Sequence, residues 1–355
     1  MSAWTELAVV RIKADAQRSA DTHLIKLEIP ALAGVDLYLK DESSHPTGSL
    51  KHRLARSLFL YALCNGQIHQ GTTVIEASSG STAVSEAYFA RMIGVPFVAV
   101  MPRKTATAKI KQVEFYGGRC HFVDCPTQMH DAAAALATEC NGHFMDQFRF
   151  AERATDWRGN NNIAESIFRQ MSLETHPLPA AIVMSAGTGG TTATLGRYIR
   201  YKGFNTTLMA VDPEHSVFYD VWETGDRSIE IKLGSRIEGI GRPRAEESFQ
   251  PTVIDRMLRV PDGASVAAML WLEQFTGRRA GASTGTNLWG MLTLAAEMHR
   301  RGEQGSLVTL ICDGGERYPD SYYDEAWVAE NIGDISGYQS QLSGMLGRNR
   351  FRVGK

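Results

Sequence analysis

The stretch Ala180-Ala-Ile-Val-Met-Ser-Ala-Gly-Thr-Gly-Gly-Thr191 is the clearest indication of the fold. Residues 180–184 are an apolar run typical of a buried strand, and residues 192–201 have the pattern of a helix. Between them, Gly187, Gly189 and Gly190 let the backbone approach an anion closely, and the N–H groups at a helix start point toward it. Thr188 and Thr191 add hydroxyl donors. The stretch predicts a cradle for a monophosphate, with a tight turn that binds nothing as the alternative; it lacks the Gly-Lys-Ser/Thr of a Walker loop.

The same order of strand, small-residue turn and helix recurs along the chain. Strands are expected at 35–40, 72–77, 95–101, 121–124, 207–212 and 307–312, and helices at 83–93, 106–116, 129–140, 266–276 and 287–301. This alternation predicts an α/β protein with doubly wound parallel sheets. Ligands of such sheets bind beyond the carboxyl ends of the strands, where the small-residue turns lie.

A second stretch, Pro46-Thr-Gly-Ser-Leu-Lys51, places a lysine in the first turn of a helix. Leucines recur every four residues from Leu50 to Leu58. Thr47 and Ser49, which precede them, are both N-cap candidates. The helix dipole and partial burial both favour the neutral amine of Lys51, and a neutral lysine can form a Schiff base with an aldehyde cofactor. The alternative is an ordinary surface lysine at a helix start.

Ser78-Ser-Gly-Ser-Thr82 joins the strand at 72–77 to the helix at 83–93. Free N–H groups at the helix start, with the hydroxyls of Ser78, Ser79 and Thr82 around Gly80, suit a carboxylate or a phosphate. The alternative is a well-capped helix without a ligand.

Composition excludes several classes of protein. The chain has 355 residues, of which 43% are hydrophobic and 21% charged, as expected of a globular protein with one large or two smaller domains. The net charge of −2 argues against nucleic acid or an anionic membrane as the partner, and no apolar run approaches the roughly 20 residues of a membrane span. The N-terminus lacks the features of a signal peptide. Five cysteines without a Cys-x-x-Cys pair predict no metal site and a reduced, cytoplasmic setting.

Together these motifs resemble the cysteine synthase and cystathionine β-synthase family of pyridoxal phosphate enzymes, known as fold type II, over about residues 20–325. The resemblance implies that Lys51 forms the Schiff base and that residues 187–191 hold the cofactor's phosphate. It implies that residues 78–83 bind the substrate's carboxylate together with Gln147. It also implies that Gly239, in Gly239-Ile-Gly241, contributes to a substrate loop and that Ser283 faces the pyridine nitrogen.

Three departures from the family pattern bear on the reaction. Ser81 replaces a cofactor-contacting asparagine, so that hydrogen bond is lost or bridged by water; His45 and His52 flank the lysine stretch; and Arg149-Phe-Ala-Glu152 replaces an asparagine- and proline-rich segment. These departures favour β-elimination on L-cysteine, giving sulfide, pyruvate and ammonia, over a plain cysteine synthase that uses O-acetylserine and sulfide. A neutral Ser283 also favours expulsion of a β-leaving group. Serine or threonine dehydration, a non-catalytic binding protein and a nucleotide-binding module remain alternatives.

The resemblance also implies a domain organisation and an assembly. A domain at 41–149 would carry the lysine and the carboxylate loop, a larger one at 1–40 plus 150–330 would carry the phosphate cup, and 331–355 would be a tail. Basic residues near the end of that tail predict a solvated segment: Arg348, Arg350, Arg352 and Lys355. A homodimer is expected. The leaving group, the second substrate and the preference for L or D amino acids stay open.

Overall fold

The structure, a computed structural model, describes residues 2–18 and 21–346. Its contacts divide the chain into two compact units, a smaller one of Met1–Asp21 and His45–Asp156 and a larger one of Thr22–Ser44 and Trp157–Lys355. The sequence had assigned residues 1–40 to the larger unit. In the structure the first helix, α1 (Ala3–Gln17), belongs to the smaller unit, because Ala8 and Ile12 are buried in that unit's core.

A four-stranded parallel sheet in the order β5-β4-β3-β6 forms the centre of the smaller unit. Its helices and strands after α1 are α2 (Lys51–Cys64), β3 (Val74–Ala77), α3 (Ser81–Ile93), β4 (Phe97–Pro102), α4 (Thr107–Phe115), β5 (Arg119–Val123), the 3₁₀ turn Pro126–Gln128, α5 (Met129–Glu139), β6 (His143–Phe144) and α6 (Gln147–Ala154).

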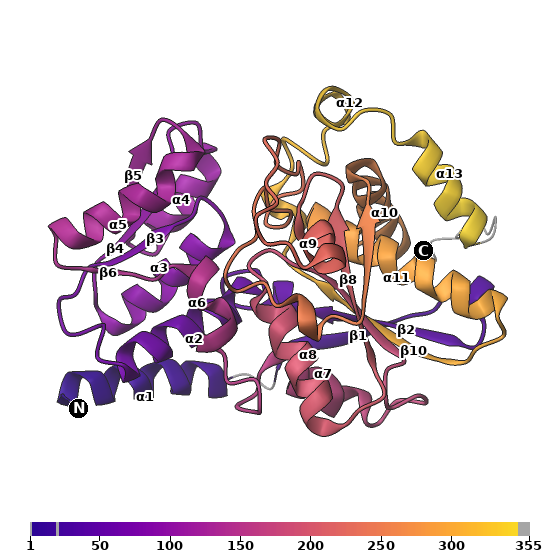
Figure 1. Cartoon of the computed structure of the whole chain (residues 1–355), viewed down its shortest axis with the longest axis horizontal. Helices are drawn as coiled ribbons and strands as arrows, with labels where there is room; N and C mark the ends of the chain where they lie inside the picture. The colour runs from indigo at the N-terminus through magenta and orange to yellow at the C-terminus, as the bar shows by residue number, and fades with distance from the viewer. Residues whose placement is uncertain (1, 19–20, 347–355) are drawn as a thin grey trace. The chain divides into compact units, whose positions relative to one another are not determined.

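Alternate residues of these strands pack on opposite faces of the sheet. Val74 and Ala99 point toward the core formed with α2 and α3, whereas Ile75 and Val98 point toward the core formed with α5. Figure 1 shows α2 and α3 on one side of this sheet and α5 on the other. The period of two places Glu76, on β3, on the α3 side with Val74.

The larger unit contains a six-stranded sheet in the order β1-β2-β10-β7-β8-β9, in which β1 is antiparallel to β2 and the other pairs are parallel. Its helices and strands are β1 (His23–Leu27), the 3₁₀ turns Pro30–Leu32 and Glu42–Ser44, β2 (Val35–Asp41), α7 (Ile163–Met171), β7 (Ala181–Ser185), α8 (Gly190–Lys202), β8 (Thr207–Pro213), α9 (Phe218–Thr224), the 3₁₀ turn Pro251–Val253, β9 (Arg256–Val260), α10 (Asp262–Thr276), α11 (Ala282–Arg300), β10 (Gly305–Ile311), the 3₁₀ turn Gly315–Arg317, α12 (Glu325–Asn331) and α13 (Ser336–Met345).

Helices cover both faces of the larger sheet, with α10 and α11 on one side and α7 and α8 on the other (Figure 1). The doubly wound α/β architecture is therefore confirmed. Helices α10 and α11 pack so closely at Gly285 that a Cβ there would lie 1.9 Å from the carbonyl oxygen of Ser265. None of the helices in residues 2–18 and 21–346 has the length and apolarity needed to cross a membrane.

Several segments differ from the expectations from sequence, and three of them bear on the predictions above. Helix α11 begins at Ala282, five residues before the expected start, so Ser283 lies in the first helical turn. Strand β9 was not predicted, since its two arginines interrupt the apolar pattern. The tail is folded up to residue 346, although most of its residues are exposed: α13 packs against α10, and Leu342 and Leu346 are buried. Its four basic residues lie outside the described part of the chain.

Candidate cofactor and substrate site

Lys51 is the first residue of α2 and is partly buried. Leu50, not Ser49, occupies the N-cap position of α2. The Oγ of Ser49 nevertheless accepts the Lys51 N–H at 3.3 Å, so the N-cap prediction for Ser49 is right only in part. Thr47 has another function. Its hydroxyl is hydrogen-bonded to Nδ1 of His52 at 3.1 Å and to the hydroxyl of Ser85 on α3 at 2.9 Å. The start of the lysine helix is therefore joined to α3 by buried hydrogen bonds.

The imidazole of His52, which follows Lys51, is buried and stacks on that of His45 with ring centroids 4.9 Å apart. Nε2 of His52 lies 3.7 Å from the carboxylate of Asp15 on α1. Burial lowers the pKa of His52 to about 4, so the ring is neutral near pH 7. The two histidines that depart from the family pattern thus form one stacked pair, and His52 joins the lysine helix to α1 and α3.

The loop between β3 and α3 leads into a helix start whose N–H groups point into the loop. Gly80 is the N-cap, and no side chain caps it. The hydroxyl of Ser78 accepts the Gly80 N–H at 3.2 Å, and Ser79 and Ser81 are partly buried. A carboxylate could accept hydrogen bonds from these N–H and hydroxyl groups.

The structure brings two of the predicted carboxylate-binding residues together. The hydroxyl of Thr82 donates to Oε1 of Gln147 at 2.7 Å, although the two residues are 65 positions apart, and both side chains are 3% exposed. This hydrogen bond orients the glutamine amide with its Nε2 directed away from Thr82. A substrate's carboxylate can accept from that N–H.

Sequence analysis missed Glu76, whose fully buried carboxylate supports this arrangement. Its Oε1 accepts the Ala77 N–H at 2.7 Å and its Oε2 accepts the Gln147 N–H at 3.2 Å. Asp146, between β6 and α6, has φ of +47°, a left-handed conformation that turns the chain into the glutamine helix. A glutamate inside the apolar run Val-Ile-Glu-Ala is the signal that could have identified Glu76.

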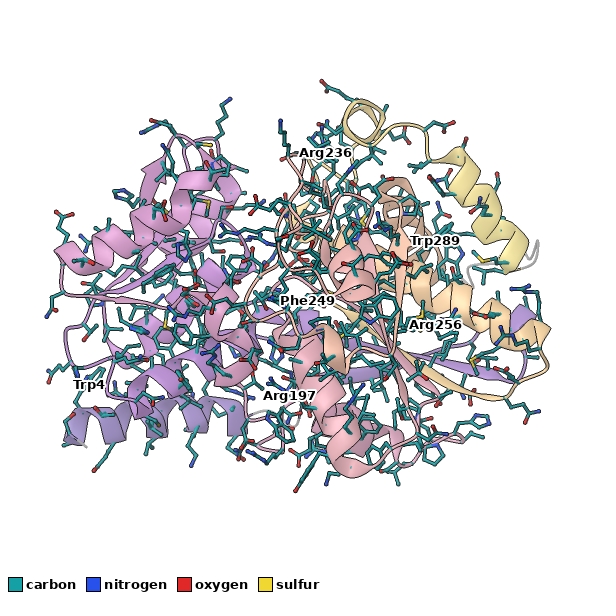
Figure 2. All side chains as sticks on the ribbon, viewed as in Figure 1. Trp4, Arg197, Arg236, Phe249, Arg256 and Trp289 are labelled. Carbon is teal, nitrogen blue, oxygen red and sulfur yellow. The ribbon has the colours of Figure 1, made fainter. Side chains whose placement is uncertain are left out.

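In the larger unit, the predicted phosphate cradle lies between β7 and α8. Gly189 is the N-cap of α8 with φ of +92°, and the Gly190 N–H donates to Thr188 Oγ1 at 3.3 Å. A Cβ on Gly189 would lie 2.6 Å from Cα of Phe249. Phe249, labelled in Figure 2, stacks on Phe218 with ring centroids 4.0 Å apart. Glycine is therefore required at this position for both conformation and space.

Ser283 and the phosphate cradle are held by one buried side chain. Asn287, one turn after Ser283 on α11, accepts the N–H of Ser185 at 2.6 Å through Oδ1 and donates to the carbonyl of Leu310 at 3.3 Å through Nδ2. Ser185 is the last residue of β7, directly before the glycine-rich turn. The start of α11 and the start of the cradle are consequently fixed to each other.

The predicted substrate loop has two left-handed glycines, with φ of +83° at Gly239 and +74° at Gly241. Hydrogen bonds at both ends hold it. The Glu238 N–H donates to the hydroxyl of Tyr322 at 2.9 Å, and the Arg242 N–H donates to Ser216 Oγ at 3.0 Å. Gly239 itself is exposed, so its backbone is accessible to a ligand.

The residues present fit a phosphorylated aldehyde. The N-terminus of the 13-residue helix α8, with the hydroxyls of Thr188 and Thr191, has the donors that a phosphate dianion requires. Lys51 supplies a primary amine for the aldehyde, and Ser283 a neutral hydroxyl for a ring nitrogen. Among residues 2–18 and 21–346, no group of three histidine, cysteine or acidic side chains could hold a metal ion.

Comparison with known proteins agrees with this chemistry. A family model described as pyridoxal-phosphate dependent enzyme matches residues 17–313. The chain is 58% identical over 343 residues to L-cysteine desulfhydrase Cds1 of Mycobacterium tuberculosis (strain ATCC 25177 / H37Ra), covering 96% of this chain and 93% of that protein. It is 29% identical to cysteine synthase of Aquifex aeolicus (strain VF5), covering 80% of this chain and 82% of that protein.

Among solved structures, the chain is similar to O-ureido-L-serine synthase, with a TM-score of 0.75 and 25% identity over 87% of this chain and 96% of that one. The fold expected from the motifs is thus found in a solved relative. With a family model matching most of its length, the chain belongs to the family of pyridoxal-phosphate dependent enzymes.

Proposed function

We propose that this enzyme is an L-cysteine desulfhydrase, which converts L-cysteine and water into hydrogen sulfide, pyruvate and ammonia. The observation that carries the proposal is the 58% identity to a protein of that activity over nearly the full length of both chains. The cysteine synthase of Aquifex aeolicus, by comparison, is 29% identical.

In this proposal the residues of the smaller unit bind the amino acid. The hydroxyls of Ser78, Ser79 and Thr82, the N–H groups around Gly80 and the amide of Gln147 hold the substrate's carboxylate. A carboxylate held at several points fixes the direction of the Cα–H bond. The Thr82–Gln147 hydrogen bond of 2.7 Å supports this assignment, because it orients the amide in advance.

Lys51 has two functions in the proposal. Its Nζ would hold the cofactor's aldehyde group, and its free amine would be the base that takes the proton from Cα of the substrate. The cofactor, when bound, withdraws electrons from Cα and so stabilises the charge left there. As the proton leaves, the Cβ–S bond breaks and the sulfur departs with its electron pair. Water then completes the conversion of the three-carbon remainder to pyruvate and ammonia.

The larger unit would anchor and tune the cofactor. Gly187, Thr188, Gly189, Gly190 and Thr191 would hold the phosphate. The hydroxyl of Ser283 would face the ring nitrogen without enforcing its protonation, which favours loss of a β-substituent over transamination. Ser81 would approach the ring oxygen, and the backbone at Gly239 would approach the substrate.

A second candidate is β-replacement, in which sulfide adds to the carbon skeleton of O-acetylserine and cysteine is formed. The likeness to a cysteine synthase supports it. Incubation with L-cysteine, D-cysteine, O-acetylserine plus sulfide, and L-serine, with assays of sulfide, pyruvate and cysteine, separates the candidates. Equal yields of sulfide and pyruvate from L-cysteine, abolished by Lys51→Ala, are expected. Cysteine formation as the faster reaction would favour the synthase, and no reaction at all would contradict both.

We also propose a cytoplasmic homodimer. The family resemblance supports the dimer, and the five cysteines, all free thiols in the structure, suit a reducing compartment. Sedimentation of the purified protein at two concentrations tests the assembly, for which the expected mass is twice 39.1 kDa. A mass of one chain at both concentrations would overturn it.

A further inference from the structure

A second buried acid, Glu86 on α3, faces Glu76 behind the predicted carboxylate loop. Both side chains are 0% exposed. Within the described residues, no N–H or O–H group of the protein reaches either oxygen of Glu86, and the group that raises its pKa, beside burial, is the carboxyl of Glu76. An ionised carboxylate without a hydrogen-bond partner is costly to bury, and more so beside a second carboxylate, so burial favours a proton on one of the two acids.

The surroundings of the two acids indicate which one carries that proton. Glu76 accepts two backbone N–H groups, from Ala77 and Gln147, and these stabilise a negative charge. Glu86 accepts none among the described residues. Burial raises the pKa of both groups, and the adjacent Glu76 raises the pKa of Glu86 further. The arrangement therefore corresponds to a neutral Glu86 that donates to an ionised Glu76.

The pair closes a ring of contacts through three elements of the smaller unit. Glu76 on β3 accepts the Gln147 N–H at the start of α6, and Oε1 of Gln147 accepts from Thr82 on α3. Thr82 and Glu86 are four residues apart on α3 and so lie on one face of that helix. The interaction of Glu86 with Glu76 completes the ring. Thr82 and Gln147, the two carboxylate-binding candidates, thus lie on one side of the ring and the acid pair on the other.

A third acid, on the segment before α6, also acts on Glu76. Asp146, with its strained left-handed backbone, adds a negative charge that disfavours ionisation of Glu76, and its carboxylate lies 3.5 Å from Nε2 of His130. The neighbouring negative charges therefore favour the neutral form of one of the two glutamates.

We propose that Glu86 is a positioning residue: it carries a proton, donates a hydrogen bond to Glu76, and so holds Gln147 and Thr82 in the arrangement that binds the substrate's carboxylate. The part of the inference that concerns substrate binding rests on the proposed function, whereas the protonation of Glu86 does not. Glu86 touches neither substrate nor cofactor in this proposal. Its effect reaches the substrate through Glu76 and the Gln147 backbone.

Two substitutions at Glu86 separate the hydrogen bond from the space that the side chain fills. Glu86→Gln keeps a donor to Glu76 and cannot ionise, whereas Glu86→Leu fills a similar volume without any donor. Ile93→Ala, at the buried end of the same helix, is the control for loss of stability alone. If Glu86→Leu does not fold, Glu76→Gln tests the same ring. The side-chain NH₂ of a glutamine at this position would face the N–H of Ala77 or of Gln147, so one of these two hydrogen bonds would be lost.

The first readout is the infrared spectrum of the parent protein minus that of Glu86→Gln. A carbonyl band of a protonated, buried carboxylic acid is expected in the parent and absent from the variant. The absence of such a band in the parent would overturn the proposal, whether or not the enzyme is active on any amino acid.

The second readout is the affinity for L-alanine, an amino acid without a leaving group, followed by the visible absorbance of the bound cofactor. Because Glu86→Leu releases a charge-assisted hydrogen-bond network, we expect weaker binding by about 10-fold or more, with Glu86→Gln and Ile93→Ala within about threefold of the parent. For turnover of L-cysteine, KM should rise more than kcat falls. Unchanged affinity in Glu86→Leu would overturn the positioning function. A parent that does not respond to L-alanine would count against the proposed function, and the infrared band alone would then decide the inference.

Discussion

Replacement of Gly189 by alanine tests the phosphate cradle most directly. At φ of +92° an alanine costs about 1–2 kcal/mol, because its Cβ approaches the following carbonyl oxygen. The new Cβ would also lie 2.6 Å from the carbonyl oxygen of Ser248 and from Cα of Phe249, both of them backbone atoms. Overpacking of this kind costs about 1–3 kcal/mol. The sum is about 2–5 kcal/mol.

The same helix provides a matched control for this substitution. Gly203, the C-cap of α8, has φ of +65°, and a Cβ there would meet nothing within 4 Å. Gly203→Ala therefore has the conformational cost without the collision. The difference between the two variants in free energy of unfolding, about 1–3 kcal/mol, measures the collision alone.

Urea denaturation of both variants without cofactor, followed by titration with pyridoxal phosphate, is the assay. Phe249 cannot move aside easily, because it is fully buried and stacked on Phe218, so the cradle must shift instead. Gly189→Ala should therefore be less stable than Gly203→Ala and should bind the cofactor at least 10-fold more weakly. Equal stability and equal cofactor affinity in the two variants would refute the assignment of this turn as the phosphate cradle.

Three further outcomes are expected. Lys51→Ala should be colourless after purification beside a yellow parent; a yellow variant with its colour resistant to dialysis would show that another amine holds the cofactor. Thr82→Val, which removes the hydroxyl donor to Gln147 at 2.7 Å, should raise KM for the amino acid by roughly 10-fold, because a buried amide oxygen left unpaired costs about 1–3 kcal/mol, while the cofactor colour persists. His52 has its pKa lowered to about 4 by burial, so between pH 6.5 and 4 the unfolded chain takes up a proton that the folded chain does not, and stability falls as pH falls through this window by up to about 3 kcal/mol. Urea unfolding of the parent and of His52→Gln across that range checks this, and parallel curves for the two proteins would contradict it.

Much of the architecture was accessible from local pattern. The strands around 35–40, 181–185 and 207–213 follow from apolar runs, and the glycine-rich turn at 187–191 predicted a helix N-terminus that the structure confirms. These features depend on residues close in the chain, since the periods of strands and helices and the conformational freedom of glycine act within a few positions. The family and its cofactor followed from the order of such motifs.

Other features depend on which elements pack together, and spacing along the chain does not encode that. The Thr82–Gln147 hydrogen bond, the approach of His52 to Asp15, and the place of α1 in the smaller unit all join segments distant in sequence. Glu76 and Glu86 are an instance at short range: each looks misplaced in its own apolar segment, and the proton that we propose for Glu86 follows only from the burial of both acids. The sequence by itself determined the fold class and the helix starts at Lys51 and at the glycine-rich turn, because these are local. The tertiary structure decided how the carboxylate-binding residues are held, because burial and the partners of a buried charge exist only once the elements have packed.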